Sequence, residues 1–153
     1  MADSTQASLE WRLALVDVTA FHEDAALVVD VEPGTFRVNA NVDLDEEQQV
    51  LVVPVKVEVL RSEDSDDVMA GVELVCVFQF KSFEGARNDE GAVRIDRSQV
   101  IAALGIAFST ARGVLIGRAR HPVFSQAVLP ILSPREQFES LINVSDKPWI
   151  GTS

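Results

Sequence analysis

Alternation of apolar and polar residues dominates the first 80 positions and predicts β-strands. Between residues 36 and 44 every second side chain is apolar, and the side chains between them are polar. A strand with one buried and one solvated face has this two-residue period. The same alternation predicts further strands from Leu9 onward, over residues 48–61 and over residues 68–80.

Short connections join these strands, and consecutive strands with short connections favour an antiparallel sheet. Residues 61–67, RSEDSDD, are typical of a polar turn. Pro54 interrupts the third strand. Because proline cannot donate a ladder hydrogen bond, we expect it at a sheet edge or at a bulge.

After residue 82 the two-residue period ends, and a loop followed by a helix is predicted. Residues 82–96 are polar and predict a loop, after which Asp96 or Ser98 can cap a helix. This helix is expected from about Val100 to Arg120, because its apolar residues recur every three or four positions. The apolar positions are Leu104, Phe108, Ala111, Leu115 and Ala119.

A second, shorter helix is predicted near the C-terminus. After an extended stretch at 124–132, Ser133, Pro134 and Glu136 have the spacing of a capping box with proline at the first helical position. The apolar face of this helix consists of Phe138, Leu141 and Ile142.

These elements predict the α+β fold class, with a four-stranded antiparallel sheet followed by a long helix and a short C-terminal helix. The chain has 153 residues, enough for one domain with its own core. We expect a flexible N-terminus over residues 1–8, a single domain over 9–145 and a C-terminal tail over 146–153.

Charge is unevenly distributed along this acidic chain, whose net charge is −11. Residues 1–80 contain 17 acids and 4 bases, whereas residues 81–153 contain 7 acids and 9 bases. An acidic surface repels nucleic acid and anionic lipid and attracts cationic partners. The same acids are also explained by solubility alone. We therefore expect no nucleic-acid partner and leave a basic protein partner open.

Side chains for catalysis or metal binding are scarce, so we predict a non-enzymatic protein without a cofactor or a metal. The sequence has two histidines, one cysteine and no tyrosine, and it lacks phosphate-loop and nucleophile-elbow motifs. Cys76 lies in an apolar strand, where an inert core thiol is expected. No signal peptide is recognisable, and the apolar stretch Val100–Phe108 is too short to cross a bilayer. These features predict a cytoplasmic protein without membrane insertion.

Aromatic and aliphatic residues exceed what one small core needs, which predicts oligomerisation, a hydrophobic groove, or both. The competing interpretation is a core completed by the two helices. We expect small residues of the long helix to lie near a subunit interface, namely Ala107, Ala111, Gly113 and Gly117.

The order of these elements and several short motifs resemble the SecB family of export chaperones. The long helix carries Phe108 and the pair Ala111-Arg112, as in the family, and Phe124 to Leu129 then match its Phe-x-Gln-x-x-Leu segment. Upstream, residues 38–44 resemble the second strand of the family, and Asp17 resembles an acidic position in its first strand.

The resemblance implies ATP-independent holding of unfolded polypeptide clients in hydrophobic grooves by a homotetramer built as a dimer of dimers. It also implies delivery of clients to the motor SecA, which docks on acids of the exposed sheet face, here Asp17 and Glu73. A leucine next to these acids in the family is Gly71 here, a departure that weakens the expectation of SecA binding. The candidates for the client groove are Phe36, Val38, Phe78, Phe80 and Phe138.

Three functional classes are therefore compared. The first is a general holding chaperone for export, and the second is a SecB-like chaperone dedicated to one client, such as an antitoxin. An enzyme on an α+β fold is the third class, and the poor inventory of catalytic side chains argues against it.

Overall fold

The structure is a computed structural model and describes residues 9–24, 35–60, 67–120 and 133–151. The predicted extended stretch at 124–132 lies outside these residues. The elements, in chain order, are β1 (Trp11–Glu23), β2 (Thr35–Ala40), β3 (Asp43–Asp45), β4 (Val50–Leu60), β5 (Val68–Phe80), the short 3₁₀ helix η2 (Glu84–Ala86), α1 (Arg97–Arg118), α3 (Pro134–Leu141) and the 3₁₀ helix η3 (Val144–Asp146).

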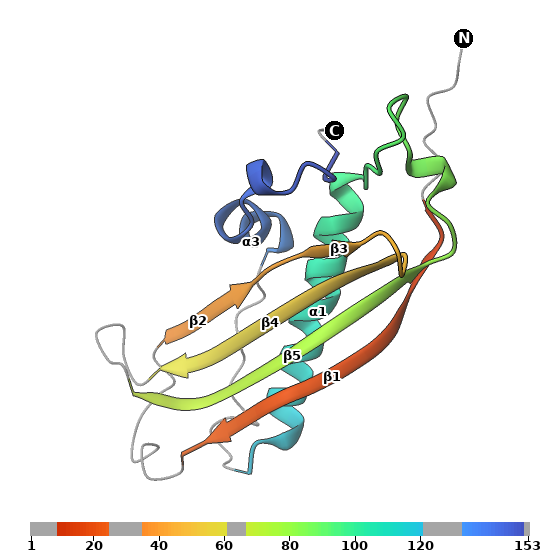
Figure 1. The fold of residues 1–153 in the computed structure, drawn as a ribbon. Coiled ribbons are helices and arrows are strands. Elements are labelled where there is room, and N and C mark those ends of the chain that lie inside the picture. Colours follow the sequence, from red (N-terminus) through yellow and green to blue (C-terminus); the bar gives the residue numbers. More distant parts are fainter. Residues whose placement is uncertain (1–8, 25–34, 61–66, 121–132, 152–153) are drawn as a thin grey trace.

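The strands form one antiparallel sheet in the order β1-β5-β4-β2, with β3 also paired to β4. α1 crosses behind the sheet, and α3 lies near β2 at the opposite edge from β1 (Figure 1). We call the sheet face that packs on α1 the inner face and the opposite one the outer face. The α+β class predicted from the sequence is confirmed. The last predicted strand, β5, lies beside the first, so that β1 is an edge strand.

The strand predicted over residues 36–44 is divided into β2 and β3. The division falls at Asn41 and Val42, where the Asn41 side chain accepts a hydrogen bond from the backbone N–H of Val42. Pro54 lies opposite this division, because β2 pairing with β4 ends at Val55 and β3 pairing begins at Val52. The prediction of an edge position for Pro54 is therefore wrong, since β4 is an interior strand. Proline has no backbone N–H to donate, and Pro54 lies where the hydrogen bonding of β4 with β2 and β3 is interrupted.

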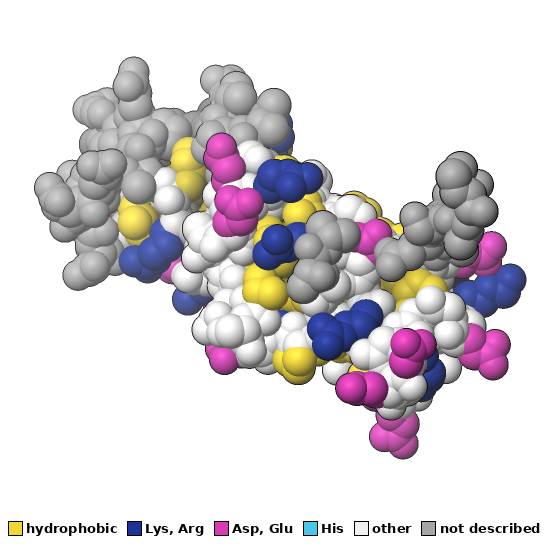
Figure 2. Space-filling model, turned by 90° about the horizontal axis from the view of Figure 1, so that it is seen from above, with side chains coloured by type: hydrophobic (Ala, Val, Ile, Leu, Met, Phe, Trp, Pro, Cys, Tyr) yellow, Lys and Arg dark blue, Asp and Glu magenta, His cyan; other side chains and the backbone are white. Residues whose placement is uncertain are grey.

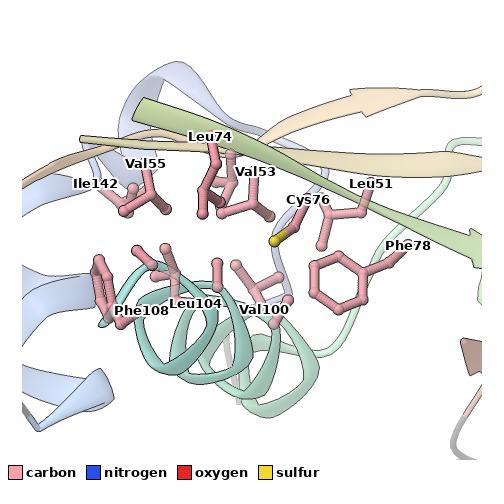
Figure 3. Packing of buried hydrophobic residues seen from close by; sticks show 14 of the residues in the cluster. Leu51, Val53, Val55, Leu74, Cys76, Phe78, Val100, Leu104, Phe108 and Ile142 are labelled. Carbon is pink, nitrogen blue, oxygen red and sulfur yellow. The ribbon is translucent and has the colours of Figure 1, made fainter. Parts of the chain in front are cut away.

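The core lies between the inner face of β4 and β5 and the buried side of α1. Figure 3 shows Leu51, Val53 and Val55 of β4, with Leu74, Cys76 and Phe78 of β5, pointing toward Val100, Leu104 and Phe108 of the helix. In the pairing of β4 with β5, Val53 lies directly opposite Cys76 and Val55 lies directly opposite Leu74, so all four side chains point to the inner face. Burial of this apolar layer is the main stabilisation of the fold.

Local capping sets where both helices begin. The Asp96 side chain accepts a hydrogen bond from the N–H of Ser98, and α1 starts at Arg97. Ser133 accepts from the N–H of Glu136, and Pro134 is the first residue of α3, as the capping box predicts. Both helix starts follow from short-range sequence signals.

Packing continues beyond the predicted domain end at residue 145. Ile150 is 2% exposed, and the backbone N–H of Ile95 donates to the carbonyl of Trp149 over 2.7 Å. The Lys147 ammonium also lies 2.9 Å from a carboxylate oxygen of Asp43. The domain therefore includes residues up to Gly151.

Two leucines on neighbouring strands give a direct test of this arrangement. Leu74 is 1% exposed and Leu15 is 55% exposed. Leu74→Ala should lower the free energy of unfolding by about 2–5 kcal/mol, because it removes buried methyl groups and leaves a cavity. Leu15→Ala should change it by no more than about 0.5 kcal/mol. Urea unfolding followed by circular dichroism measures both, and equal losses would contradict the placement of the two side chains.

Candidate functional site

Asp17 and Glu73, the predicted docking acids, both lie on the outer face of the sheet. In the pairing of β1 with β5, Asp17 is opposite Val75 and Glu73 is opposite Ala20. Asp17 is exposed, and the Glu73 side chain is 45% exposed. Alternation along the two strands therefore brings both carboxylates to one side, although 56 residues separate them in the sequence.

Basic side chains accompany these acids. The Lys56 ammonium lies 3.5 Å from a carboxylate oxygen of Glu73 and 3.9 Å from one of Glu58. Arg37 donates from Nε to Glu58 over 2.9 Å, and the Glu58 side chain is only 9% exposed. We call Arg37, Glu58, Lys56 and Glu73 the charge ladder, because they alternate in sign across β2, β4 and β5. Most of the negative charge on the outer face is thus compensated locally.

The sheet face that holds the predicted docking acids Asp17 and Glu73 also holds bases. By strand pairing, the described outer face has five acids, Asp17, Asp43, Asp45, Glu58 and Glu73, and three bases, Arg12, Arg37 and Lys56. In the view from above, which is a different side of the molecule, acidic and basic side chains likewise lie beside one another with hydrophobic atoms between them (Figure 2). The outer face therefore has an excess of acids, as the whole chain does, but the acids are mixed with bases.

An apolar band crosses the outer face beside the charge ladder. Leu15 of β1 is opposite Val77 of β5, which in turn is opposite Val52 of β4. The next row contains Val75 and Pro54. The outer face is thus half apolar and half charged.

Two shallow depressions open onto the charged half of this face. One has a volume of about 390 Å³ and is lined by residues that include Thr19, Asn39 and Lys56. The other, of about 240 Å³, lies over Gly71. A Cβ added at Gly71 would stay at least 3.4 Å from its nearest neighbour, so the site would accept a side chain. The depression occupies the position where the SecB family is expected to have a leucine.

Large exposed apolar side chains concentrate on β1. Within the described residues they are Leu13 at 39%, Leu15 at 55%, Val16 at 37% and, on α1, Ile106 at 40% exposure. Leu13 and Val16 point to the inner face, opposite Phe78 and Cys76, and Leu15 points to the outer face. We call Leu13, Leu15 and Val16 the β1 patch. No single sequence motif signals it, because all three residues look like ordinary core positions of a strand.

Three of the five groove candidates lie in the core. Phe78, Phe80 and Phe138 are at most 1% exposed, and Trp11 lies 4.9 Å from Phe78 between ring centroids. Arg97 additionally covers the Phe138 ring at 5.0 Å. Side chains buried in this way complete the core and cannot line an open groove in this conformation.

The other two groove candidates, Phe36 and Val38, are partly buried on β2, where they face Val59 and Val57. They lie at the sheet edge opposite to the β1 patch. The structure therefore does not bring the five candidates together on one exposed surface.

The exposed side of α1 is a second apolar surface, but its composition differs from the prediction. Ala107 and Ala111 are fully buried against the sheet, whereas Gly113 and Gly117 are exposed. The outward side instead borders an open depression of about 610 Å³, lined by Ala102, Gly105, Ile106, Ser109, Thr110 and Pro134. Helical periodicity explains the difference, because residues 107 and 111 follow the buried stripe of Leu104 and Phe108.

α1 is also long and apolar enough to cross a membrane by length and composition alone, which the nine-residue stretch considered in the sequence did not indicate. Eight of its 22 residues are buried, among them Val100, Leu104 and Leu115. Core helices of soluble proteins pass the same test, and packing on the sheet buries 39% of the apolar window of α1.

Histidine, cysteine and acidic side chains are the residue types that could bind a metal. No group of three or more potential metal ligands occurs among those residues. His22 lies at the end of β1, with Nε2 at 3.3 Å from the carbonyl of Val68. His121 lies outside the described residues.

Cys76 is fully buried, as expected of a core thiol. Burial raises the pKa of the Cys76 thiol, while a hydrogen bond with Thr110 acts in the opposite direction. A thiol in this state is a poor nucleophile.

Comparison with known proteins finds a distant structural similarity but no match in sequence. No protein family and no curated protein matches the sequence. Among solved structures, the chain is similar to a SecB-like chaperone of Mycobacterium tuberculosis in complex with a peptide from an antitoxin. The identity is 17% over 79% of this chain and 87% of that chain, with a TM-score of 0.43. A likeness of this degree concerns the fold and carries no inference about binding.

The buried thiol gives a prediction for the pH dependence of stability. In the unfolded chain the thiol ionises near its ordinary pKa of 9.0, and in the folded protein it ionises at higher pH. Stability contributed by the neutral buried thiol is therefore complete below pH 9.0 and is lost above it, by at most about 1.4 kcal/mol per pH unit. Urea unfolding at several pH values between neutral and alkaline gives the free energy of unfolding of the reduced wild type and of Cys76→Ala. The stability advantage of the wild type over Cys76→Ala should shrink above pH 9.0, and an advantage that does not change with pH would contradict the prediction.

Proposed function

We propose that this protein is an ATP-independent chaperone that holds unfolded polypeptide clients in the cytoplasm. The observation that supports this most is the β1 patch, three large apolar side chains within four residues of an edge strand. Exposed apolar clusters of this kind are typical of protein interaction surfaces. The resemblance of the sequence to the SecB family points to the same class of partner.

Holding many sequences requires apolar area rather than a shaped pocket. Fully burying one leucine or valine side chain contributes about 1.5–3 kcal/mol. Leu13, Leu15 and Val16 are each between 37% and 55% exposed, so contact with a client can bury a large part of each. Unfolded chains expose such segments and folded ones do not, which makes the binding selective for the unfolded state.

Delivery to the SecA motor is the less supported part of this proposal. In the SecB family, an acidic face is expected to bind a basic tail, but here Glu73 already has a basic neighbour, Lys56, at 3.5 Å. Gly71 further removes the apolar side chain expected beside the acids. These observations favour the second candidate, a chaperone dedicated to one client such as an antitoxin.

Assembly into a homotetramer is part of the same proposal. The surface that supports it is the outward side of α1. Residues 98–111 contain no charged side chain, although the chain as a whole is highly charged. Ala102 and Ser109 beside the 610 Å³ depression are small enough to allow close approach of a second helix, whereas Gly105 makes room for Pro134 of the same chain.

Replacing two of the three side chains of the β1 patch should weaken holding. We expect Leu13→Ser with Leu15→Ser to weaken binding of reduced, carboxymethylated α-lactalbumin roughly tenfold, because less apolar area is buried. Fluorescence anisotropy of the labelled client measures the affinity. Leu141→Ser on α3 removes a comparable partly buried side chain far from β1 and serves as the control. Equal affinity of both variants and the wild type would contradict the proposal.

Client range separates the two chaperone classes in the same assay. A general holding chaperone should bind several unrelated unfolded proteins with similar affinity. A dedicated chaperone should bind an antitoxin segment and leave unrelated unfolded proteins to aggregate.

Sedimentation velocity tests the assembly. The 16.7 kDa chain should sediment as four copies at micromolar concentration. Ile106→Glu with Ser109→Glu places two charges on the outward side of α1 and should halve the mass, because burying unpaired charges is costly. A monomer from micromolar to millimolar concentration would contradict the tetramer, and an unchanged mass in the variant would contradict the α1 interface.

A further inference from the structure

The C-terminal segment, residues 143–151, is hydrogen-bonded mainly to itself. The Asn143 side chain accepts from the backbone N–H and the hydroxyl of Ser145, and it donates to the Asp146 carboxylate over 2.8 Å. Three backbone N–H groups of the segment also donate to carbonyls of the same segment. Of all its residues, only Ile150 is buried. We call this segment the C-terminal strap, and it leads from α3 to the start of α1 (Figure 1).

Two side chains attach the C-terminal strap to the rest of the domain. The Lys147 ammonium lies 2.9 Å from a carboxylate oxygen of Asp43 in β3, and only 17% of the Lys147 side chain is exposed. Ile150 is 2% exposed and belongs to the core, whereas Val144 and Trp149 are only partly buried against it. A segment with one buried side chain and mainly internal hydrogen bonds can open while the sheet stays folded.

Backbone pairing of the strap has the geometry of a bound extended peptide. Ile150 forms a parallel bridge with Ile95, which lies just before α1. The N–H of Ile95 donates to the carbonyl of Trp149, and the carbonyl of Ile95 accepts from the N–H of Gly151, each over 2.7 Å. Opening of the strap would expose both backbone groups of Ile95 together with the apolar place of Ile150. Backbone groups beside an apolar pocket are the means by which proteins bind extended peptides.

The strap also shows which chemistry this site accepts. Lys147 supplies a positive charge for Asp43, and Ile150 fills the apolar place three residues later. A Cβ at Gly151 would lie 3.2 Å from the carbonyl oxygen of Ile95, which is tighter than an ordinary van der Waals contact. The site therefore favours a basic residue, two further residues, an aliphatic residue and then glycine.

We propose that the C-terminal strap occupies a binding site for extended segments of other polypeptides that have this pattern. The inference builds on the proposed holding of polypeptides, but its site consists of β3 and the residue before α1 and does not include the β1 patch. A matching segment replaces the strap because it forms the same ion pair, the same two hydrogen bonds and the same apolar contact. Occupation by the strap lowers the apparent affinity for other chains by the fraction of molecules in which it is open. The strap thus excludes segments that match the pattern poorly.

Binding of a labelled peptide with the sequence of residues 147–151, Lys-Pro-Trp-Ile-Gly, tests this site. Fluorescence anisotropy with the full chain compares the wild type with Ile150→Ala, which removes most of the buried side chain of the strap. We expect Ile150→Ala to bind the peptide about tenfold more tightly or better, because the site is then more often open. Leu141→Ala truncates a partly buried side chain of α3 outside the strap and should bind as the wild type does.

Matched peptides and a second variant check the assigned contacts. Serine in place of the isoleucine should abolish binding, and alanine in place of the glycine should weaken it. Lys147→Glu leaves the core side chains unchanged and breaks the ion pair with Asp43, so it should also bind the peptide more tightly than the wild type does.

Charge reversal at β3 tests the selection of a basic residue. In the Ile150→Ala protein, adding Asp43→Lys should shift the preference from the lysine peptide to one with glutamate in its place. Glu46→Lys, the same charge change in the turn after β3, should leave the preference unaltered. An unchanged preference with Asp43→Lys would overturn the assigned site.

The remaining outcomes separate this proposal from the holding function. If neither Ile150→Ala nor Lys147→Glu binds the peptide more tightly than the wild type, while unfolded α-lactalbumin is still held, the strap site is wrong and the holding function stands. If neither the peptide nor unfolded α-lactalbumin binds, both proposals fail. If Ile150→Ala or the added peptide lowers the sedimenting mass, the strap occupies the site of a neighbouring copy, and occupation within one chain is overturned.

Discussion

The packing of one helix across the two central strands is the constraint on which the rest of the structure depends. An α-helix with its side chains is about 10 Å wide, whereas neighbouring strands lie about 4.8 Å apart. α1 can therefore cover β4 and β5 but cannot extend over the whole sheet (Figure 1). The inner-facing side chains Leu13 and Val16 of β1 remain exposed for this reason, although they occupy the same face as the core.

The outer face follows a different rule, because no described helix covers it. β4 and β5 still place valines there, namely Val52, Val75 and Val77. Beside them the charge ladder joins three strands through ion pairs, of which the two that involve Glu58 are the most shielded from water. Exposed ion pairs contribute little to stability, so the main effect of the ladder is to remove net charge from this surface.

An edge strand with apolar side chains on both faces is an aggregation hazard unless pairing is restricted. Two register shifts interrupt β1 here, between Leu13 and Leu15 and between Val18 and Ala20. For a protein proposed to hold unfolded polypeptides, the binding surface and the protection against aggregation are thus the same strand.

Much of the local structure is determined by the sequence alone. Alternation over residues 50–60 and 68–80 specifies which side chains of β4 and β5 face the core, and the Asp96 and Ser133 caps specify where α1 and α3 begin. Periodicity and capping act over a few residues, so they can be recognised without knowing the fold.

Only the tertiary structure decides which of these faces are covered. Phe78 and Phe80 are in the core and Leu15 is in solvent, yet all three occupy similar alternating positions in the sequence. The neighbour of β1 is β5 rather than β2, and Lys56 reaches Glu73 only because β4 and β5 are in one particular register. Exposure and charge compensation depend on contacts between residues far apart in the chain, and a local pattern contains no information about those contacts.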